Sequence, residues 1–309
     1  MSVRPYHRAD ARAWLALLNL LRERPLDLGS FLDRERSRVS REKPLRLVFE
    51  ENSEILGIVE GVVSAYLPED HLMTAIAVTP TARRRGIGTL LFNEFKTVAL
   101  EAGIAGLACE VVENDPNVYN WARSCGLRDH VRRISSTLDL AVWSEARQTV
   151  RETALAAHGF ILTTMGDGLV RSEELLPFFR DRVSEAPDMA NMPRWDLELC
   201  RSILFKNPHA RDDWIVVAQL NGRIAGLAVM HSLGTDAYLY FVGSAPWARG
   251  RGLGVALIGY LAGQAKAERI PILRIDNIES NSPALRINDQ IGFVGQTVRV
   301  ELRRTLTTP

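Results

Sequence analysis

Apolar and polar residues follow one recurring order along both halves of this 309-residue chain. Short apolar runs are typical of strands, and apolar residues spaced three and four apart are typical of amphipathic helices. In the first half, this pattern predicts strands over 2–6, 44–51, 55–66, 72–78, 104–112 and 131–140 and helices over 8–41 and 116–124, with one more helix after residue 86.

The second half repeats the same order. The pattern predicts strands over 159–165, 215–220, 224–230, 238–244, 270–276 and 298–303 and helices over 173–184, 196–205, 253–268 and 283–291. Asn221-Gly222 separates two of these strands, which is a strong signal for a β-hairpin. Residues 141–158 are polar and rich in Ala, which indicates a connecting helix. We therefore predict two domains, residues 1–142 and 159–309, joined by residues 143–158.

A basic loop that contains glycine occurs once in each half. The first copy is Arg83-Arg84-Arg85-Gly86-Ile87-Gly88 and the second is Arg249-Gly250-Arg251-Gly252-Leu253-Gly254. Each copy follows an apolar strand and a Pro, and each opens a predicted helix. Equivalent glycines of the loops lie 166 residues apart, as do Gly126 and Gly292 further on. The chain is therefore a duplication of one strand–loop–helix unit.

This loop has the chemistry of an anion site. A helix N-terminus presents unpaired N–H groups and a partial positive charge, and glycines let a ligand approach the backbone closely. Flanking arginines add charge-assisted hydrogen bonds. A Walker A loop is excluded because no Lys follows the glycines, and a Rossmann fingerprint is excluded because Leu91 and Leu257 stand where a third glycine is needed.

The composition of the chain limits the classes of molecule that are expected to bind it. The chain is 46% hydrophobic and 24% charged with a net charge of +1, which is ordinary for a globular protein and argues against a nucleic-acid partner. The sequence lacks a signal-peptide pattern and any apolar run of the ~18 to 20 residues that a membrane span needs. We expect a cytoplasmic protein with no membrane partner. Cys109, Cys125 and Cys200 are scattered, and the histidines show no ligand spacing, so we expect buried thiols and no metal site.

The pattern Arg-x-x-Gly-x-Gly after a strand, with a later Asn-containing helix that ends in Gly-Leu or Gly-Phe, resembles the GNAT superfamily of acetyl-coenzyme A-dependent N-acetyltransferases. The resemblance covers most of both halves, and its core spans residues 72–140 and 238–304. The duplication is similar to tandem members of the superfamily, of which mycothiol synthase is one example. The resemblance implies an α/β (α+β) fold class with two tandem GNAT folds, each a mixed, mostly antiparallel splayed sheet flanked by helices.

The resemblance also implies acetyl-coenzyme A as cofactor, with its pyrophosphate on the loop amides and its pantetheine arm along the preceding strand. The implied binding residues are Ile76, Ala77, Val78, Arg83, Arg84, Arg85, Gly86, Ile87, Gly88 and Thr89 in the first half and Val242, Gly243, Ser244, Arg249, Gly250, Arg251, Gly252, Leu253, Gly254 and Val255 in the second. Asn281, just before Pro283, has the pattern of a helix cap, and in this family an Asn here often also bonds the pantetheine arm.

Acyl transfer needs a donor for the departing thiolate. Many superfamily members use a Tyr four residues before the Gly of the final helix, but here Ala122 and Asn288 hold that position. Asn288 can donate a hydrogen bond to sulfur, although it cannot give up a proton. Tyr119 lies one turn before Ala122 and is a candidate acid; the alternative is an ordinary surface or core Tyr.

The reaction also needs a group that holds the substrate ammonium and takes its proton. Some members carry a Glu on the strand before the loop, where Leu72 and Tyr238 are the nearest equivalents here. Asp276, aligned with Glu110, follows the fifth strand and fits this role either directly or through water. The alternative for Asp276 is a role near a helix N-terminus, where acids are favoured in any case, and this alternative is preferred for Glu113 and Glu279. Tyr238 and Tyr240 share one face of their strand and line either an acceptor pocket or the core.

We therefore expect an N-acetyltransferase that acts on a primary amine of a small molecule, as a monomer or homodimer. The second half is the expected catalytic half because its final helix and aromatic strand are richer in candidate residues, with Asp276, Asn288, Tyr240 and Tyr119 as the candidate catalytic residues overall. The alternatives are a non-catalytic acyl-coenzyme A sensor and an enzyme for longer acyl groups. Segments 8–41 and 172–206 are expected to select the acceptor, with Asp188, Met189 and Trp195 as candidate pocket residues.

Overall fold

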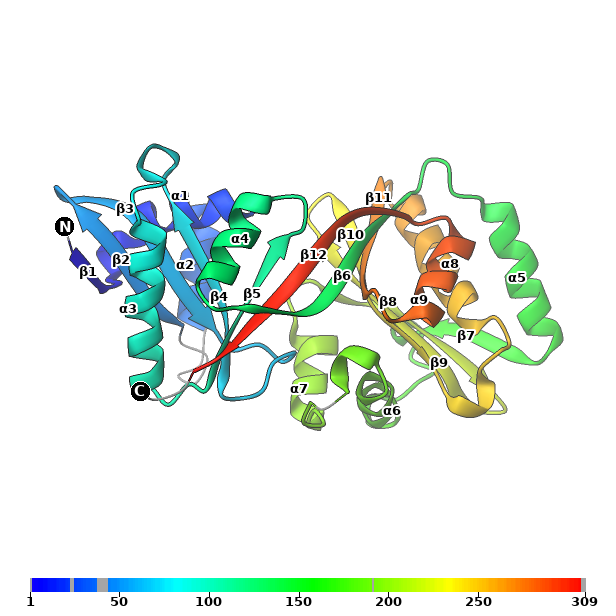
Figure 1. The fold of residues 1–309 in the computed structure, drawn as a ribbon. Helices are drawn as coiled ribbons and strands as arrows, with labels where there is room; N and C mark the ends of the chain where they lie inside the picture. The colour runs from blue at the N-terminus through cyan, green and yellow to red at the C-terminus, as the bar shows by residue number, and fades with distance from the viewer. Residues whose placement is uncertain (1, 23–24, 38–43, 191, 307–309) are drawn as a thin grey trace. The chain divides into compact units, whose positions relative to one another are not determined.

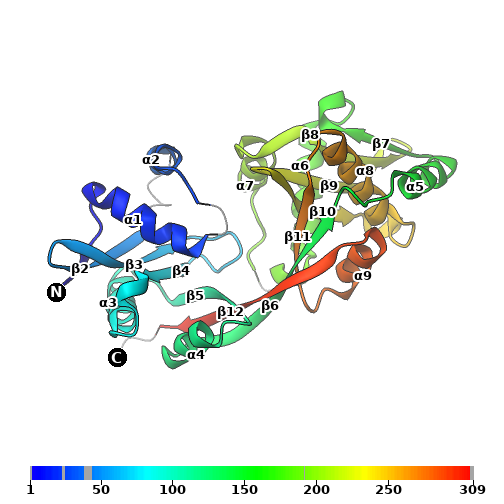
Figure 2. The same ribbon diagram turned by 90° about the horizontal axis from the view of Figure 1, so that it is seen from above.

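The computed structural model describes residues 2–22, 25–37, 44–190 and 192–306. The chain divides into two compact units, one of residues 1–131 with 300–309 and one of residues 132–299. Each unit is a mixed sheet with helices on both faces (Figures 1 and 2). This architecture confirms the predicted fold class.

In the first unit, the strands lie in the order β1-β2-β3-β4-β5-β12. From β1 to β5, neighbouring strands are antiparallel, except that β4 and β5 are parallel. The strands are β1 (Ser2–Pro5), β2 (Leu45–Glu51), β3 (Glu54–Val62), β4 (His71–Val78), β5 (Gly106–Val112) and β12 (Val294–Thr305). The helices are α1 (Ala11–Leu18) and α2 (Leu28–Ser37) on one face and α3 (Ile87–Glu101) and α4 (Pro116–Ser124) on the other.

In the second unit, the order is β7-β8-β9-β10-β11-β6, and only β10 and β11 are parallel. The strands are β6 (Arg128–Asp139), β7 (Phe160–Thr164), β8 (Ala210–Leu220), β9 (Arg223–Leu233), β10 (Asp236–Ser244) and β11 (Ile272–Ile278). The helices are α6 (Ser172–Ser184) and α7 (Leu197–Arg201) on one face and α5 (Glu145–Ala157), α8 (Leu253–Ala267) and α9 (Ser282–Ile291) on the other.

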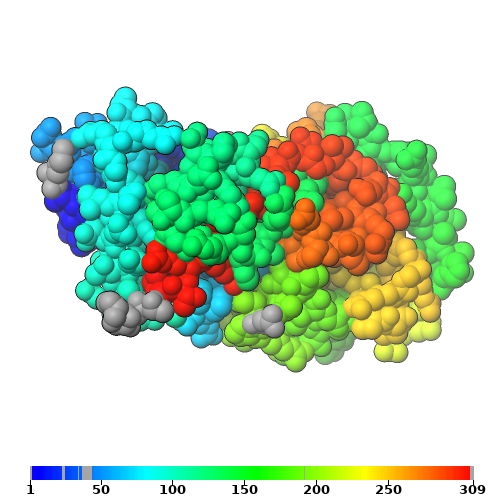
Figure 3. Space-filling model, viewed as in Figure 1, coloured from blue at the N-terminus to red at the C-terminus, as the bar shows by residue number. Residues whose placement is uncertain are grey.

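Each unit takes its last strand from the other half of the sequence. Residues 133–139 of β6 pair with β11 in the second unit. In the first unit, Val300 and Leu302 of β12 are buried in the core, and Figure 3 shows the red atoms of the chain's end set among cyan and green ones. The predicted division at residues 142 and 158 follows the sequence repeat, whereas the compact units follow this exchange. The exchanged strand covers the edge that β5 or β11 would otherwise expose.

Most predicted elements are present with bounds shifted by a few residues. The predicted helix over 8–41 is interrupted, because α1 ends at Leu18 and α2 begins at Leu28; residues 23–24 and 38–41 of it lie outside the described part. The predicted connecting helix is α5, and it packs along α8 within the second unit. No described helix is both long and apolar enough to cross a bilayer.

The exchanged strand gives a direct test of the fold. Leu302 has no exposed surface in the first unit, so Leu302→Ala should lower the free energy of unfolding by about 2–5 kcal/mol. Urea denaturation of the full chain measures the effect. Val294→Ala is the matched control on the same strand, because Val294 is 60% exposed and its truncation should change stability by less than about 0.5 kcal/mol. Equal effects of the two substitutions would contradict the exchange.

Candidate active site

The fourth and fifth strands of each unit separate soon after they begin to pair. In the first unit, the parallel pairs run only from His71 to Met73 on β4, and in the second only Ala237 and Tyr238 of β10 pair with β11. Beyond these residues the facing backbone groups are not paired with each other. A gap of this kind can receive an extended chain that completes the hydrogen bonding. The predicted splay is thus present in both units.

The two basic loops follow the same backbone path. The second position is left-handed in both, with φ of 64° at Arg84 and 75° at Gly250, and so is the helix N-cap, with φ of 81° at Gly86 and 76° at Gly252. A Cβ on Gly86 or Gly252 would meet no described atom within 4 Å. These two glycines are therefore required by the backbone conformation, and the space above them is open to a ligand.

The helices that follow these loops have free N-termini. Four other helices are capped by the side chains of Asp115, Ser144, Asp196 and Asn281. In the described residues, no side chain caps α3 or α8. Their first N–H groups therefore remain available to an anion, which the helix dipole favours at this end.

In the first unit, side chains of the protein itself occupy the surroundings of the loop. All three arginines donate hydrogen bonds: Arg83 Nε to Val78 O (3.1 Å), Arg84 Nη2 to Asn117 Oδ1 (2.8 Å) and Arg85 Nη2 to Glu51 Oε1 (2.7 Å). The carbonyl that Arg83 uses belongs to the strand that was predicted to pair with pantetheine.

A second bridge closes the gap between α3 and α4. The Trp121 ring lies 3.5 Å from the position of a Cβ on Gly88, and Trp121 Nε1 donates a hydrogen bond to Thr89 Oγ1 at 3.1 Å. Together with the bond from Arg84 to α4, this contact ties the two helices together at the mouth of the first loop.

The second loop lacks both bridges. Gly250 stands where the first loop has Arg84, and Val255 stands where it has Thr89. Ile287, the counterpart of Trp121, packs against Gly254 and has no polar atom on its side chain. Arg249 forms an ion pair with Glu185, the C-cap residue of α6. The mouth of the second loop is therefore the more open of the two.

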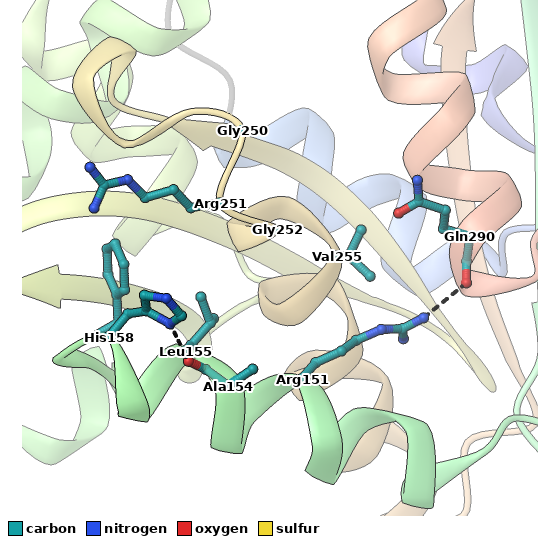
Figure 4. Close-up of a pocket in the computed structure, with 10 residues that line it drawn as sticks. Arg151, Ala154, Leu155, His158, Gly250, Arg251, Gly252, Val255 and Gln290 are labelled. Carbon is teal, nitrogen blue, oxygen red and sulfur yellow. Dashed lines mark hydrogen bonds between the residues drawn. The ribbon is translucent and has the colours of Figure 1, made fainter.

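A pocket of about 540 Å³ lies directly beside the second loop (Figure 4). Its lining comes from the loop, from the first turn of α8, from α9, from β7 and from the connecting helix α5. The lining residues are Arg151, Ala154, Leu155, His158, Phe160, Gly250, Arg251, Gly252, Val255 and Gln290. Arg151 and His158 of this lining were not predicted as site residues, although their separation by two helical turns gave a signal.

A β-bulge distinguishes β10 from β4. The pairing of β10 with β9 shifts between Leu239 and Phe241, so Tyr240 is an extra residue, whereas the pairing of β4 with β3 shows no shift. The register of the parallel pairs agrees: Leu107 and Leu273 are 166 residues apart, but their partners Leu72 and Ala237 are 165 apart. The counterpart of Tyr238 is consequently Met73, not Leu72. A bulge of this kind re-aims neighbouring groups and often marks an active site.

Polar side chains form a row across the splay on the face opposite α8. Asp276 of β11 accepts a hydrogen bond from Tyr238 Oη at 3.2 Å and one from Ser135 Oγ of β6 at 2.5 Å. On the same face, Tyr240 stacks on His231 with ring centroids 4.7 Å apart. The structure therefore brings the predicted residues Asp276 and Tyr240 to one face, and it adds Ser135, which the sequence did not indicate.

Asn288 lies on the other face of β11. Its side chain is buried, Nδ2 donates to Asn277 Oδ1 at 2.6 Å, and Oδ1 is buried without a hydrogen-bond partner in the described structure. Because Asn277 follows Asp276 on the strand, their side chains point to opposite sides. Asp276 and Asn288 thus flank the same strand from its two faces. Asn281 caps α9, with Oδ1 accepting from Ala284 N at 3.3 Å.

The other predicted residues have different surroundings. The Tyr119 hydroxyl donates to Asp129 at 2.5 Å, and this hydrogen bond raises the pKa of Tyr119. Glu279 pairs with Arg132 at the surface. Three further residues are placed as follows: Asp188 pairs with Arg133 at 3.3 Å, while Met189 and Trp195 are buried. The described residues contain no group of three or more His, Cys, Asp and Glu side chains that could hold a metal ion.

Comparisons with known proteins also divide the chain into two related halves. The model of the acetyltransferase (GNAT) family matches residues 13–127 and 175–293. A GCN5-related N-acetyltransferase from Sphaerobacter thermophilus is 17% identical with a TM-score of 0.72, over 99% of this chain and 96% of that one. A tandem GNAT protein from the clavulanic acid biosynthesis pathway is 18% identical with a TM-score of 0.73, over 100% and 99%. At these identities the likeness shows the fold. A search of curated proteins finds no match.

Burial of His231 should make stability depend on pH. Burial lowers the pKa of His231 to about 4 from 6.5. Between these values the unfolded chain binds a proton that the folded chain resists, so stability falls as the pH is lowered. We expect a loss of roughly 2 kcal/mol between pH 7 and pH 4.5 from this group. His231→Phe, which keeps a ring on Tyr240, should remove this component in urea denaturation, whereas substitution of the exposed His158 by Gln should keep it. An unchanged pH slope in His231→Phe would contradict this assignment.

Proposed function

The chain belongs to the acetyltransferase (GNAT) family, and we propose that its second half moves an acetyl group from acetyl-coenzyme A to a primary amine of a small molecule. The observation that carries this proposal is the combination found in the second unit alone: an unbridged loop, a bulged β10 and an acid at the splay. In the first unit, the loop is bridged and β4 is regular.

The residues of the second unit fit coenzyme A. The N–H groups at the start of α8 and the left-handed Gly250 and Gly252 suit a diphosphate, which binds well at an uncapped helix N-terminus. The edge of β10 at Val242–Ser244 borders the gap and suits an extended pantetheine arm. Acetyl-coenzyme A would then place its thioester between β10 and β11, where Asp276 and Asn288 lie on the two sides of the strand.

Acetyl transfer forms a bond from the amine nitrogen to the acetyl carbon and breaks the bond from that carbon to sulfur. The substrate ammonium must first lose a proton, and the role proposed for Asp276 is to hold the ammonium and to accept this proton directly or through water. Tyr238 and Ser135 orient the Asp276 carboxylate by donating to its two oxygens. These bonds keep the acid at the splay rather than in the surrounding solvent.

Two further groups are suited to the negative charge that develops on the thioester carbonyl oxygen and on the departing sulfur. The bulge re-aims the backbone of β10 at this point, and the proposed donor that polarises the thioester carbonyl is a backbone N–H of the bulged stretch. Asn288 uses Nδ2 toward Asn277, and its second N–H on that nitrogen is the donor for the departing thiolate. The attacking nitrogen loses its second proton as the amide forms, and water carries a proton to the thiolate, because the Asn288 side chain does not release one.

A second function is favoured by one observation. Neither half has a Tyr at the position that many members of the superfamily use as acid, since Ala122 and Asn288 stand there. A protein that binds acyl-coenzyme A without turnover would have the same loops and the same gap. The two functions differ in whether loss of Asp276 changes a rate.

Substitution of Asp276 by Asn distinguishes acetyl transfer from binding without turnover. The amide keeps one acceptor oxygen, presents a donor NH2 group in place of the other, and cannot take a proton, so we expect kcat to fall by about 10²- to 10⁴-fold with little change in the affinity for coenzyme A. Thiol release from acetyl-coenzyme A with a panel of primary amines measures the rate. Glu279→Gln is the matched control, because Glu279 pairs with Arg132 at the surface. Release of no thiol by the unsubstituted protein with any amine would favour the binding function.

Exchange of the bridging residues between the two loops tests which loop binds coenzyme A. We expect the unsubstituted chain to bind one coenzyme A in titration calorimetry. Arg84→Gly together with Trp121→Ile gives the first loop the residues of the second and should raise the stoichiometry to two. The reverse pair, Gly250→Arg together with Ile287→Trp, should weaken binding at the second loop. Two sites in the unsubstituted chain, or no response to either exchange, would contradict the proposed difference between the halves.

A further inference from the structure

We propose that the connecting helix α5 completes a site for the 3′-phosphorylated adenosine end of coenzyme A, beside the second loop. This inference rests on the proposed function, because it assumes that the second loop holds the diphosphate of the same molecule. It adds a helix outside the duplicated unit as a determinant of which nucleotide thiol is bound.

The pocket beside the loop has the size and position for this part of the ligand. Its volume of about 540 Å³ lies in the range of roughly 300–1,000 Å³ that is typical of small-molecule sites. Gly250 and Gly252 of the loop form one wall, so the pocket is continuous with the place proposed for the diphosphate. The helix α5 forms the opposite wall, as Figure 4 shows with the loop above and α5 below.

The lining combines an apolar surface with positive charge. Leu155, Phe160 and Val255 offer apolar surface against which a purine ring can pack. Arg251 and His158 lie at one end of the pocket and Arg151 at the other (Figure 4). The lining contains no Asp or Glu. An adenosine that carries a phosphate matches this arrangement, because the base needs apolar contact and the phosphate needs charge-assisted donors.

Two of the basic side chains of the pocket are oriented by hydrogen bonds to backbone carbonyls, which leave their charge uncompensated. Arg151 Nη2 donates to the backbone carbonyl of Gln290 at 3.1 Å, which fixes the guanidinium at the rim without cancelling its charge. His158 Nδ1 lies 2.7 Å from the carbonyl of Ala154 and donates to it. Nε2 is then the nitrogen that can meet a ligand, as an acceptor in the neutral ring and as a donor to a phosphate oxygen in the protonated ring. In the described residues, neither Arg151 nor Arg251 forms an ion pair with a carboxylate.

The first loop differs at the equivalent arginine. Arg85 pairs with Glu51 at 2.7 Å, whereas Arg251 lies over the Phe160 ring at 5.9 Å from its centroid. The loop alone therefore does not create a basic pocket. The charge is retained where α5 lies beside the loop, which supports a role for this helix in binding and not only in connection.

Comparison of coenzyme A with dephospho-coenzyme A tests the proposal, because the two ligands differ only in the 3′-phosphate. In titration calorimetry of the full chain, we expect coenzyme A to bind roughly 10-fold or more tightly than dephospho-coenzyme A, as a charge-assisted contact implies. Arg151→Gln should remove most of this preference by weakening coenzyme A while leaving dephospho-coenzyme A unchanged. Arg147→Gln is the matched control, since it removes the same charge one turn away on α5 without lining the pocket.

The outcomes separate this inference from the proposed function. Binding of both ligands with equal affinity, or an equal loss of preference in Arg151→Gln and Arg147→Gln, overturns the role of α5 while the proposed function stands. Failure of the unsubstituted chain to bind either ligand overturns both. Circular dichroism and urea denaturation of the two variants show whether α5 stays folded, so that a loss of preference is not mistaken for unfolding.

Discussion

A parallel strand pair that separates after two residues governs the chemistry of the second unit. Beyond Tyr238 and Arg274, the facing edges of β10 and β11 are no longer partners, and buried backbone groups need partners. In the proposed complex, an extended amide-containing arm would supply these partners. The uncapped start of α8, which follows β10, would receive the charged part of the same molecule. In the proposed function, Asp276 and Asn288 act only because this gap would receive a thioester between them.

The two halves share a fold but differ in the side chains that surround the loop beside each gap. In the first unit, polar side chains around the loop form hydrogen bonds within the protein, from Arg84 to α4 and from Trp121 to Thr89. The second unit has small or apolar residues at those positions, and it has an additional helix beside the loop. A duplicated protein can keep one copy as a scaffold while the other retains the open site. The strand exchange makes each copy depend on the other for a complete sheet.

Much of the fold could be predicted from the sequence because its signals are local. Strand periodicity, the Asn221-Gly222 hairpin and the loop glycines act over a few residues. In the structure, Gly86, Gly250 and Gly252 of these loops have left-handed backbone conformations. The strand exchange could not be predicted, because the alternation along β6 and β12 indicates strands without indicating which sheet each one joins. The bulge at Tyr240 was missed for a related reason: one inserted residue leaves the alternation almost intact and displaces the alignment of Tyr238 by one position.

The site was predicted in parts rather than as a whole. Asp276 and Tyr240 come together on one face, but the contact of Asp276 with Ser135 joins residues 141 positions apart and leaves no local pattern. Tyr119 was a candidate by spacing alone, and its hydroxyl is bonded to Asp129. The basic side of α5 was visible as a spacing, although its meaning depends on packing against α8 that the sequence does not indicate.

Hydrogen exchange of the full chain with and without coenzyme A tests the central claim most directly, because it reports on the backbone amides that are proposed to bind. We expect protection of the amides of residues 250–255 at the start of α8 and of 242–244 on β10, with little change at residues 84–89. Equal protection of both loops would contradict the assignment of the site to the second half. Absence of protection at residues 250–255 would contradict the proposal that this loop binds coenzyme A at all.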